Sequence, residues 1–150
     1  MLIKVITFLL LIVIIAGCSG TGSEKTSNGT KKTEAPKNIE EMMAQGEKIY
    51  RTKCIVCHMP DGKGVTGTFP PLANADYLLE DKVRAVEQVL NGSNEKMVVN
   101  GVEYHTPMTP QVDTREEAVA VINYVLNSFG NDGGYVTLEE VMDIEIKPRN

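Results

Sequence analysis

The sequence predicts an all-α domain of short helices with a single small β-hairpin. Apolar residues recur at helical spacing in three stretches, before residue 54, around residue 86 and after residue 117. An Asn-Gly pair between two short β-prone runs predicts the hairpin. The chain has no Trp and only 5% aromatic residues, so its core would gain from a bulky apolar group at the centre.

Residues 1–37 are predicted to precede the folded domain. Residues 5–16 form an apolar run that is too short to span a bilayer and is typical of an export signal. The run ends in Ile15-Ala16-Gly17-Cys18, which resembles the bacterial lipobox. We therefore expect a lipoprotein signal peptide over 1–17 and a lipid on Cys18, with a chance Cys after an ordinary signal and an uncleaved anchor helix as alternatives.

Residues 18–37 follow as a lipidated cysteine and a flexible tether, because they are rich in Gly, Ser, Thr and Lys and show no apolar periodicity. The folded domain is expected over 38–150. These boundaries imply an exported domain, anchored by lipid to a bacterial membrane, in the periplasm or on the outer face of the cell membrane.

The first helix is predicted over residues 39–53. Asn38 is a suitable N-cap residue, and the acidic Glu40 and Glu41 favour the positive end of the helix dipole. Gly46 lies inside this helix, where glycine is unfavourable but is tolerated if another helix must approach closely.

Cys54 and Cys57 belong to the sequence Cys54-Ile55-Val56-Cys57-His58, the C-x-x-C-H pattern of haem attachment, here called the haem motif. At the end of a helix, two thiols at this spacing can reach both vinyl groups of one porphyrin and form thioethers. The adjacent His58 then lies under the iron as its proximal ligand. The motif therefore predicts one covalently bound haem c.

Two other uses of Cys54 and Cys57 have less support in the sequence. A thioredoxin-type redox pair requires a βαβ setting, which the sequence does not show. Half of a zinc site would need two more ligands, and only His58 and His105 are available.

Beyond the motif, residues 59–74 are rich in Gly and Pro and predict irregular backbone that could wrap a flat ligand. A short helix is predicted over residues 80–90, with Gly92 as its stop. Its inward side chains are expected to be Val83, Val86, Val89 and Leu90.

The hairpin is predicted over residues 98–104, with its turn at Asn100-Gly101. A stiff loop over 106–110 follows, and its one large apolar side chain is Met108. Prolines on both sides of Met108 limit the freedom of its backbone.

The final helices are predicted from their caps. Thr114 and Glu117 form a capping box before an apolar stripe that ends at Gly130. A last short helix over 138–143 begins with a second capping box, Thr137 with Glu140.

With these elements in order, residues 39–129 resemble a class I cytochrome c. The resemblance implies a small cytochrome c helical fold around one haem, in which the first and last helices cross at a small residue packed on an aromatic ring. Gly46, Tyr50 and Tyr124 are the candidates for that crossing.

The resemblance also assigns His58 as proximal ligand and Met108 as distal ligand. It implies that a carbonyl within residues 69–71 accepts a hydrogen bond from His58 Nδ1. Met97 is the rival thioether, and His105, close to Met108, leaves a bis-His site open.

A finer resemblance concerns the cytochrome c domains associated with copper-type nitrite reductases. It rests on residues 68–78, the Asn-Gly hairpin and the helix ending at residues 127–131. It implies delivery of electrons to a nitrite reductase or a terminal oxidase.

The charge of the domain restricts the classes of molecule that it can bind as partners. From Asn38 onward, ten Lys or Arg face eighteen Asp or Glu, a net charge of −8. This argues against nucleic acid as a partner and favours redox proteins with a basic rim.

A single-electron carrier of a membrane-associated respiratory chain is therefore the expected function, with no catalysis and no small-molecule substrate. The alternative is a haem enzyme or gas sensor with a labile sixth ligand. A purely structural lipoprotein would leave the haem motif unexplained.

Overall fold

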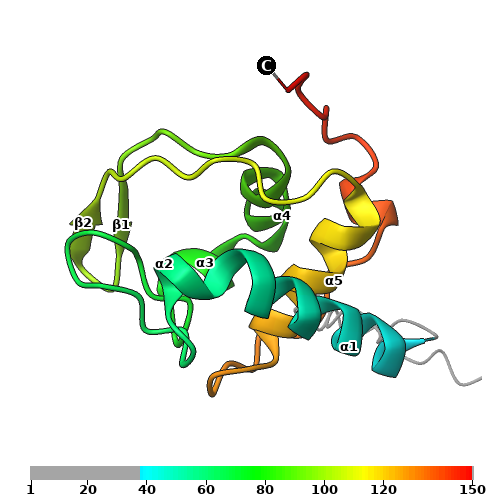
Figure 1. The fold of residues 1–150 in the computed structure, drawn as a ribbon, viewed down its shortest axis with the longest axis horizontal. Helices are drawn as coiled ribbons and strands as arrows, with labels where there is room; N and C mark the ends of the chain where they lie inside the picture. Colours follow the sequence, from blue (N-terminus) through cyan, green and yellow to red (C-terminus); the bar gives the residue numbers. More distant parts are fainter. Residues whose placement is uncertain (1–37, 150) are drawn as a thin grey trace, which may run out of the picture. The chain divides into compact units, whose positions relative to one another are not determined.

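A computed structural model describes residues 38–149 of the chain (Figure 1). The signal peptide, Cys18 and tether predicted over 1–37 lie outside these residues. None of the helices within 38–149 is long and apolar enough to cross a membrane.

The haem motif ends a helical segment made of three parts. α1 (Ile39–Ile49) continues into a π-helical turn, η1 (Tyr50–Cys54), and then into α2 (Ile55–His58). The predicted helix over 39–53 is confirmed, although helical backbone extends five residues further. The prediction of a side-chain cap at Asn38 is wrong, because its amide contacts Glu41 and makes no capping hydrogen bond.

Two short helices follow the irregular segment 59–75. α3 (Asp76–Glu80) is a helix that the sequence does not predict, and α4 (Lys82–Asn91) begins two residues later than expected. Asp81 explains the break, since its carboxylate accepts a 2.9 Å hydrogen bond from Arg84 N and caps α4.

The predicted inner face of α4 is nearly correct. Val86, Val89 and Leu90 are buried, but Val83 is 38% exposed and Ala85 is buried instead. Gly92 ends the helix as predicted, with φ +75°.

The predicted hairpin is confirmed and consists of β1 (Met97–Val99) and β2 (Val102–Tyr104), paired antiparallel with Val99 opposite Val102. Asn100 and Gly101 both have positive φ, as a two-residue hairpin turn requires. Asn100 also ties the hairpin to α3: its N–H donates to Asp76 Oδ1 at 2.8 Å, and its side-chain oxygen accepts from Asp76 N at 3.1 Å.

α5 (Arg115–Leu126) begins at Thr114, whose hydroxyl accepts a 3.2 Å hydrogen bond from Glu117 N, as the capping box predicts. The helix ends at Leu126 rather than at Gly130, and Phe129 has φ +58°. The last predicted helix is a 3₁₀ turn, η2 (Glu139–Val141).

The C-terminal segment packs on α5 through the wholly buried Asn123. Its side chain donates to Val136 O and accepts from Val136 N, both at 2.8 Å. This arrangement satisfies the peptide group of Val136, which is itself buried.

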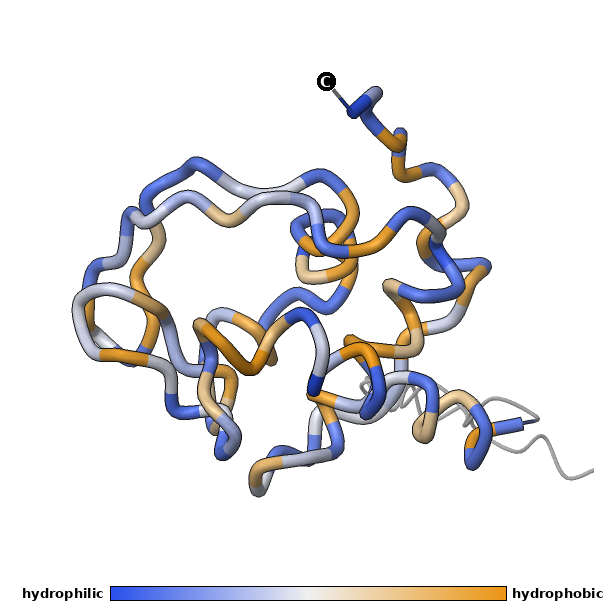
Figure 2. The backbone as a smooth tube through the Cα atoms, in the orientation of Figure 1, coloured by the Kyte–Doolittle hydropathy of each residue, from blue (hydrophilic) through white to orange (hydrophobic). Residues whose placement is uncertain are grey.

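α1 and α5 cross at Gly46, as the resemblance implied. A Cβ on Gly46 would lie 2.1 Å from Ala120 O and 2.7 Å from Tyr124 Cβ. The Tyr50 ring packs beside this contact, 5.7 Å from the Tyr124 ring and 5.0 Å from that of Phe129. Figure 2 shows hydrophobic and hydrophilic residues alternating along these helices, and the predicted all-α class with one hairpin is confirmed.

Candidate cofactor site

A cavity of about 200 Å³ brings together the four predicted haem-binding residues Cys54, Cys57, His58 and Met108. The first three come from the end of the α1–α2 segment, and Met108 comes from the segment between β2 and α5. In Figure 1 this segment crosses the domain on the side away from α2. The cavity thus has two thiols, an imidazole and a thioether in its wall.

Cys54 is buried, Cys57 is half-buried, and neither forms a disulfide within residues 38–149. Burial, and secondarily the nearby Cys57, raise the pKa of the Cys54 thiol to about 11. A reactive redox pair instead requires a thiol whose pKa is lowered. Cys54 is therefore not an activated thiol of that kind.

His58 is oriented by the backbone of the Pro-rich segment, as predicted. Its Nδ1 lies 2.9 Å from Pro70 O. Because a carbonyl can only accept, Nδ1 carries the proton and Nε2 keeps a free lone pair for a metal. Burial lowers the pKa of His58 against the opposing effect of this hydrogen bond, so the imidazole is held neutral.

Gly64 makes this hydrogen bond possible, and the sequence alone does not single it out. A Cβ on Gly64 would lie 2.3 Å from Phe69 O and 2.6 Å from Pro70 O. Gly64 also has φ +61° and donates its N–H to His58 O at 3.0 Å. The Gly-rich composition of this segment is the signal, but it does not distinguish Gly64 from its neighbours.

The backbone of Met108 is fixed by a two-way bridge to Ser93. Met108 N donates to Ser93 O and Ser93 N donates to Met108 O, both at 2.8 Å. Gly92 leaves room for this bridge, since a Cβ there would lie 2.5 Å from Met108 O. The residues that follow α4 therefore fix the position of the Met108 backbone.

We expect Gly92→Ala to displace the Met108 loop. Gly67→Ala and Gly101→Ala are matched controls, because both glycines have positive φ but a Cβ added to either would have no neighbour within 4 Å. Strain from positive φ is common to all three variants, so the clash alone should make Gly92→Ala less stable by about a further 2 kcal/mol. Urea unfolding measures this difference, and equal losses in the three variants would contradict it.

The two rivals of Met108 differ in position. Met97 lines the same cavity from β1, whereas His105 is exposed and is not part of the cavity wall. The structure thus keeps Met97 as a competing thioether and gives no support to a bis-His arrangement.

The rest of the cavity fits a haem. Its wall is mainly apolar and includes Leu78, Val89, Val121, Ile122 and Val125. Arg84 also lines it, and its buried Nε has no hydrogen-bond partner among the residues that the structure describes. A flat apolar ring with acidic substituents matches this combination of an apolar wall and an unpaired cationic donor.

Zinc remains a poor fit to the same cysteines. Within residues 38–149, no three or more His, Cys, Asp or Glu side chains are grouped so that they could hold a metal ion. A structural zinc site is four-coordinate with nitrogen, sulfur or carboxylate ligands, so the described part of the chain does not supply one.

A family model and individual relatives of the chain name the same family. The sequence model of the family described as "Cytochrome c" matches residues 43–129. "Cytochrome c-552" of Thermus thermophilus is 32% identical over 93 residues, covering 59% of this chain and 70% of that protein.

Two larger proteins are similar over part of their length. The "Alcohol dehydrogenase (quinone), cytochrome c subunit" of Gluconobacter oxydans is 25% identical over 109 residues, which is 66% of this chain and 21% of that protein. The "Cbb3-type cytochrome c oxidase subunit CcoP" of Rubrivivax gelatinosus is 29% identical over 101 residues, 67% of this chain and 31% of that protein.

Proposed function

Because the chain belongs to the cytochrome c family, we propose that it carries single electrons through one haem c, bound by Cys54 and Cys57 and ligated by His58 and Met108. The observation that supports this most is that all four side chains line one cavity. Bound haem supplies an iron that changes between the ferric and ferrous states.

Each residue has a separate task in this proposal. Cys54 and Cys57 hold the haem through thioethers, and His58 presents Nε2 because Pro70 O retains its Nδ1 proton. Met108 would be the second protein ligand of the iron and would favour the higher reduction potential of His/Met cytochromes. The apolar wall would exclude water, and an iron held by two protein ligands would leave no place for a substrate, so we propose a carrier and not an enzyme.

Covalent attachment is the first test of this function. The exported protein should keep its haem stain on a denaturing gel, and Cys54→Ser/Cys57→Ser should lose the stain. Complete extraction of haem from the unmodified protein by acid–acetone would contradict the attachment. Rapid binding of carbon monoxide by the unmodified ferrous protein at neutral pH would instead favour the haem enzyme or gas sensor.

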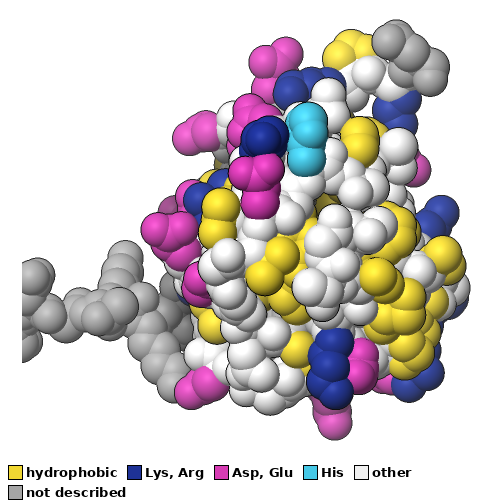
Figure 3. Space-filling view, turned by 90° about the vertical axis from the view of Figure 1, so that its left-hand side faces the viewer, with side chains coloured by type: hydrophobic (Ala, Val, Ile, Leu, Met, Phe, Trp, Pro, Cys, Tyr) yellow, Lys and Arg dark blue, Asp and Glu magenta, His cyan; other side chains and the backbone are white. Residues whose placement is uncertain are grey.

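Hydrophobic side chains beside acidic ones support docking of redox proteins. Figure 3 shows hydrophobic side chains across the centre and right of this face, with acidic side chains gathered toward its left and upper edges. Val56, inside the haem motif, is 75% exposed. We propose that partners with a basic rim contact the domain near Val56, since an acidic domain attracts them.

Respiratory enzymes are the proposed partners. The two larger relatives are named as subunits of a quinone alcohol dehydrogenase and of a cbb3-type oxidase. Together with the sequence resemblance to domains of copper-type nitrite reductases, these names support a terminal oxidase or a nitrite reductase as acceptor.

The proposed lipid on Cys18 has its own test. Cleavage before Cys18 would leave residues 18–37 as the tether of the 38–150 domain and keep that domain at high local concentration near the membrane. Cys18→Ser should release the protein into the soluble fraction or leave it unprocessed, whereas Ser19→Ala should change neither. Mass spectrometry that finds an unmodified Cys18 at the mature N-terminus would argue against the anchor.

A further inference from the structure

Residues 144–149, here called the clasp, contact three separate segments of the domain. They lie beyond residues 43–129, which match the family model. The first contact joins the clasp to the start of α5, because Arg115 Nη2 donates to Ile144 O. Ile144 and Ile146 also pack against the hydrophobic core, and Figure 1 shows this part of the chain beside the start of α5. The clasp is therefore part of the packed domain.

The second contact joins the clasp to the end of α4. Asn91 Nδ2 donates to Glu145 O at 2.8 Å, and Lys147 N donates to Asn91 Oδ1 at 2.9 Å. One side chain of α4 thus holds the clasp backbone at two points. Asn91 lies two residues before Ser93, so the clasp is attached beside the two-way bridge that fixes the Met108 backbone.

The third contact joins the clasp to the segment that follows Met108. Arg149 Nη2 donates to Val112 O, and Arg149 Nε lies 2.9 Å from Asp113 Oδ1. Val112 is buried, so its carbonyl needs a partner within the protein. The clasp therefore holds the chain on both sides of the Met108 loop, shortly before Ser93 and shortly after Met108.

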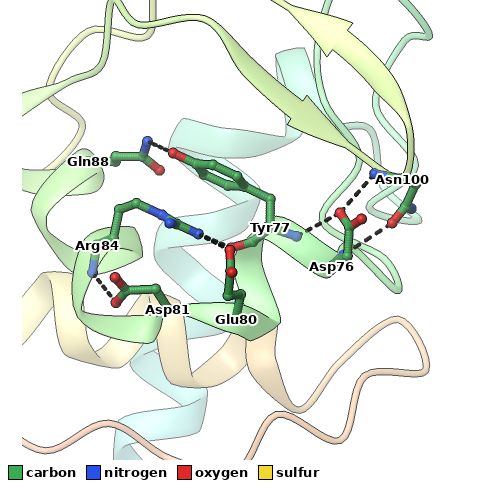
Figure 4. A network of polar contacts seen from close by, with 7 residues as sticks. All are labelled: Asp76, Tyr77, Glu80, Asp81, Arg84, Gln88 and Asn100. Carbon is green, nitrogen blue, oxygen red and sulfur yellow. Dashed lines mark hydrogen bonds and ion pairs between the residues drawn. The ribbon is translucent and has the colours of Figure 1, made fainter.

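The hairpin between these two attachment points is held separately. Asn100, in the hairpin turn, exchanges hydrogen bonds with Asp76 at the start of α3, as Figure 4 shows. The clasp takes no part in that contact. Loss of the clasp should therefore loosen the Met108 backbone while the hairpin stays attached to α3.

We propose that the clasp keeps Met108 at the iron, with Asn91 and Arg149 as positioning residues; this inference rests on the proposed function. A thioether stays on a metal only while the backbone that carries it stays in place. Anchoring this backbone on both sides makes its local opening rarer. Arg149 provides the stronger attachment, because a guanidinium donates charge-assisted hydrogen bonds. Residues 144–149 lie outside the cavity wall, so the clasp acts through the Met108 loop and not by touching the cofactor.

The test compares Arg149→Gln and Lys147→Gln in the full-length, haem-loaded protein. Both variants remove one positive charge from the clasp, but Lys147 binds Asn91 through its backbone N–H, which glutamine retains. Imidazole added to the ferric protein takes the iron position that the Met108 sulfur leaves, with no electron transferred, so its binding rate reports detachment of Met108. Arg149→Gln should speed imidazole binding about tenfold, as expected for loss of a charge-assisted hydrogen bond. Lys147→Gln should leave the rate unchanged.

Amide hydrogen exchange in the ferrous protein separates local loosening from a general loss of stability. The Ser93 and Met108 amides form the bridge, and both should exchange faster in Arg149→Gln than in the unmodified protein. The amide of Val121, buried inside α5, should exchange as before, because local and global opening affect different amides. Equal acceleration at Val121 and Met108 would mean that Arg149 only stabilises the domain, and it would overturn the proposal.

Asn91→Ala tests the attachment to α4 without changing any charge. It removes both hydrogen bonds of the second contact, and alanine is the residue most favourable to a helix. Asn91→Ala should also speed imidazole binding. An unchanged rate in Asn91→Ala or in Arg149→Gln, or an equal acceleration by Lys147→Gln, would overturn the proposal.

Failure of this inference is distinguishable from failure of the proposed function. In the first case the unmodified protein carries covalent haem and binds imidazole slowly, and the Asn91 and Arg149 variants bind it equally slowly. In the second case the unmodified protein carries no covalent haem, or it binds imidazole at once because Met108 is not a ligand.

Discussion

Met108→Ala should convert the ferrous protein from one that excludes carbon monoxide into one that binds it. Removing the thioether would open the sixth position of the iron, and it would stabilise the ferric state because Met ligation is what raises the potential. The reduction potential should therefore fall together with the gain of carbon monoxide binding. Optical titration with carbon monoxide and potentiometry measure the two changes.

Met97→Ala and His105→Ala are the controls for this result. Met97 shares the cavity and tests the competing thioether, whereas His105 lies outside the cavity wall and tests the bis-His alternative. Both controls should keep the spectrum and potential of the unmodified protein. If either one reproduces the Met108→Ala changes while Met108→Ala has none, the assignment of Met108 is wrong.

Gly46→Ala should strongly destabilise the domain although it improves helix propensity. In an exposed helix this substitution would gain up to about 1 kcal/mol. At the α1–α5 crossing the new methyl would lie 2.1 Å from the backbone oxygen of Ala120, which belongs to a helix and cannot move alone. We expect a net loss of about 3 kcal/mol, a large part of the stability of a small domain.

Chemical unfolding monitored by helical circular dichroism measures this loss. Gln45→Ala is the matched control, because Gln45 is exposed one residue earlier in α1. Gln45→Ala should change the free energy of unfolding by no more than about 0.5 kcal/mol. Equal stability of Gly46→Ala and Gln45→Ala would mean that the two helices do not meet as closely as described.

Local patterns predicted much of this fold. The Asn-Gly turn and the Thr114 cap each depend on a few neighbouring residues, and both are confirmed. The hydrogen bond from His58 to a carbonyl of residues 69–71 is also confirmed, but its prediction rested on family resemblance. Local patterns therefore predicted elements of the fold, whereas the family resemblance predicted this contact of the site.

The errors occurred where distant contacts override local preference. Asn38 contacts Glu41 instead of capping α1, and α5 ends at Leu126 where the backbone turns to place Phe129 against Tyr50. The roles of Gly64 and Gly92 depend on carbonyls of other segments. A single sequence does not reveal which of several glycines meets such a carbonyl.

The contact between α1 and α5 has a consequence for the timing of maturation. The two helices are far apart in sequence, so the face of α1 around Gly46 has no partner until the chain has been extended through α5. A chain that is made from its N-terminus presents Cys54 and Cys57 before it presents α5. Until α5 has formed, both thiols therefore lack the Val121, Ile122 and Val125 side chains that share the wall of their cavity in the folded domain.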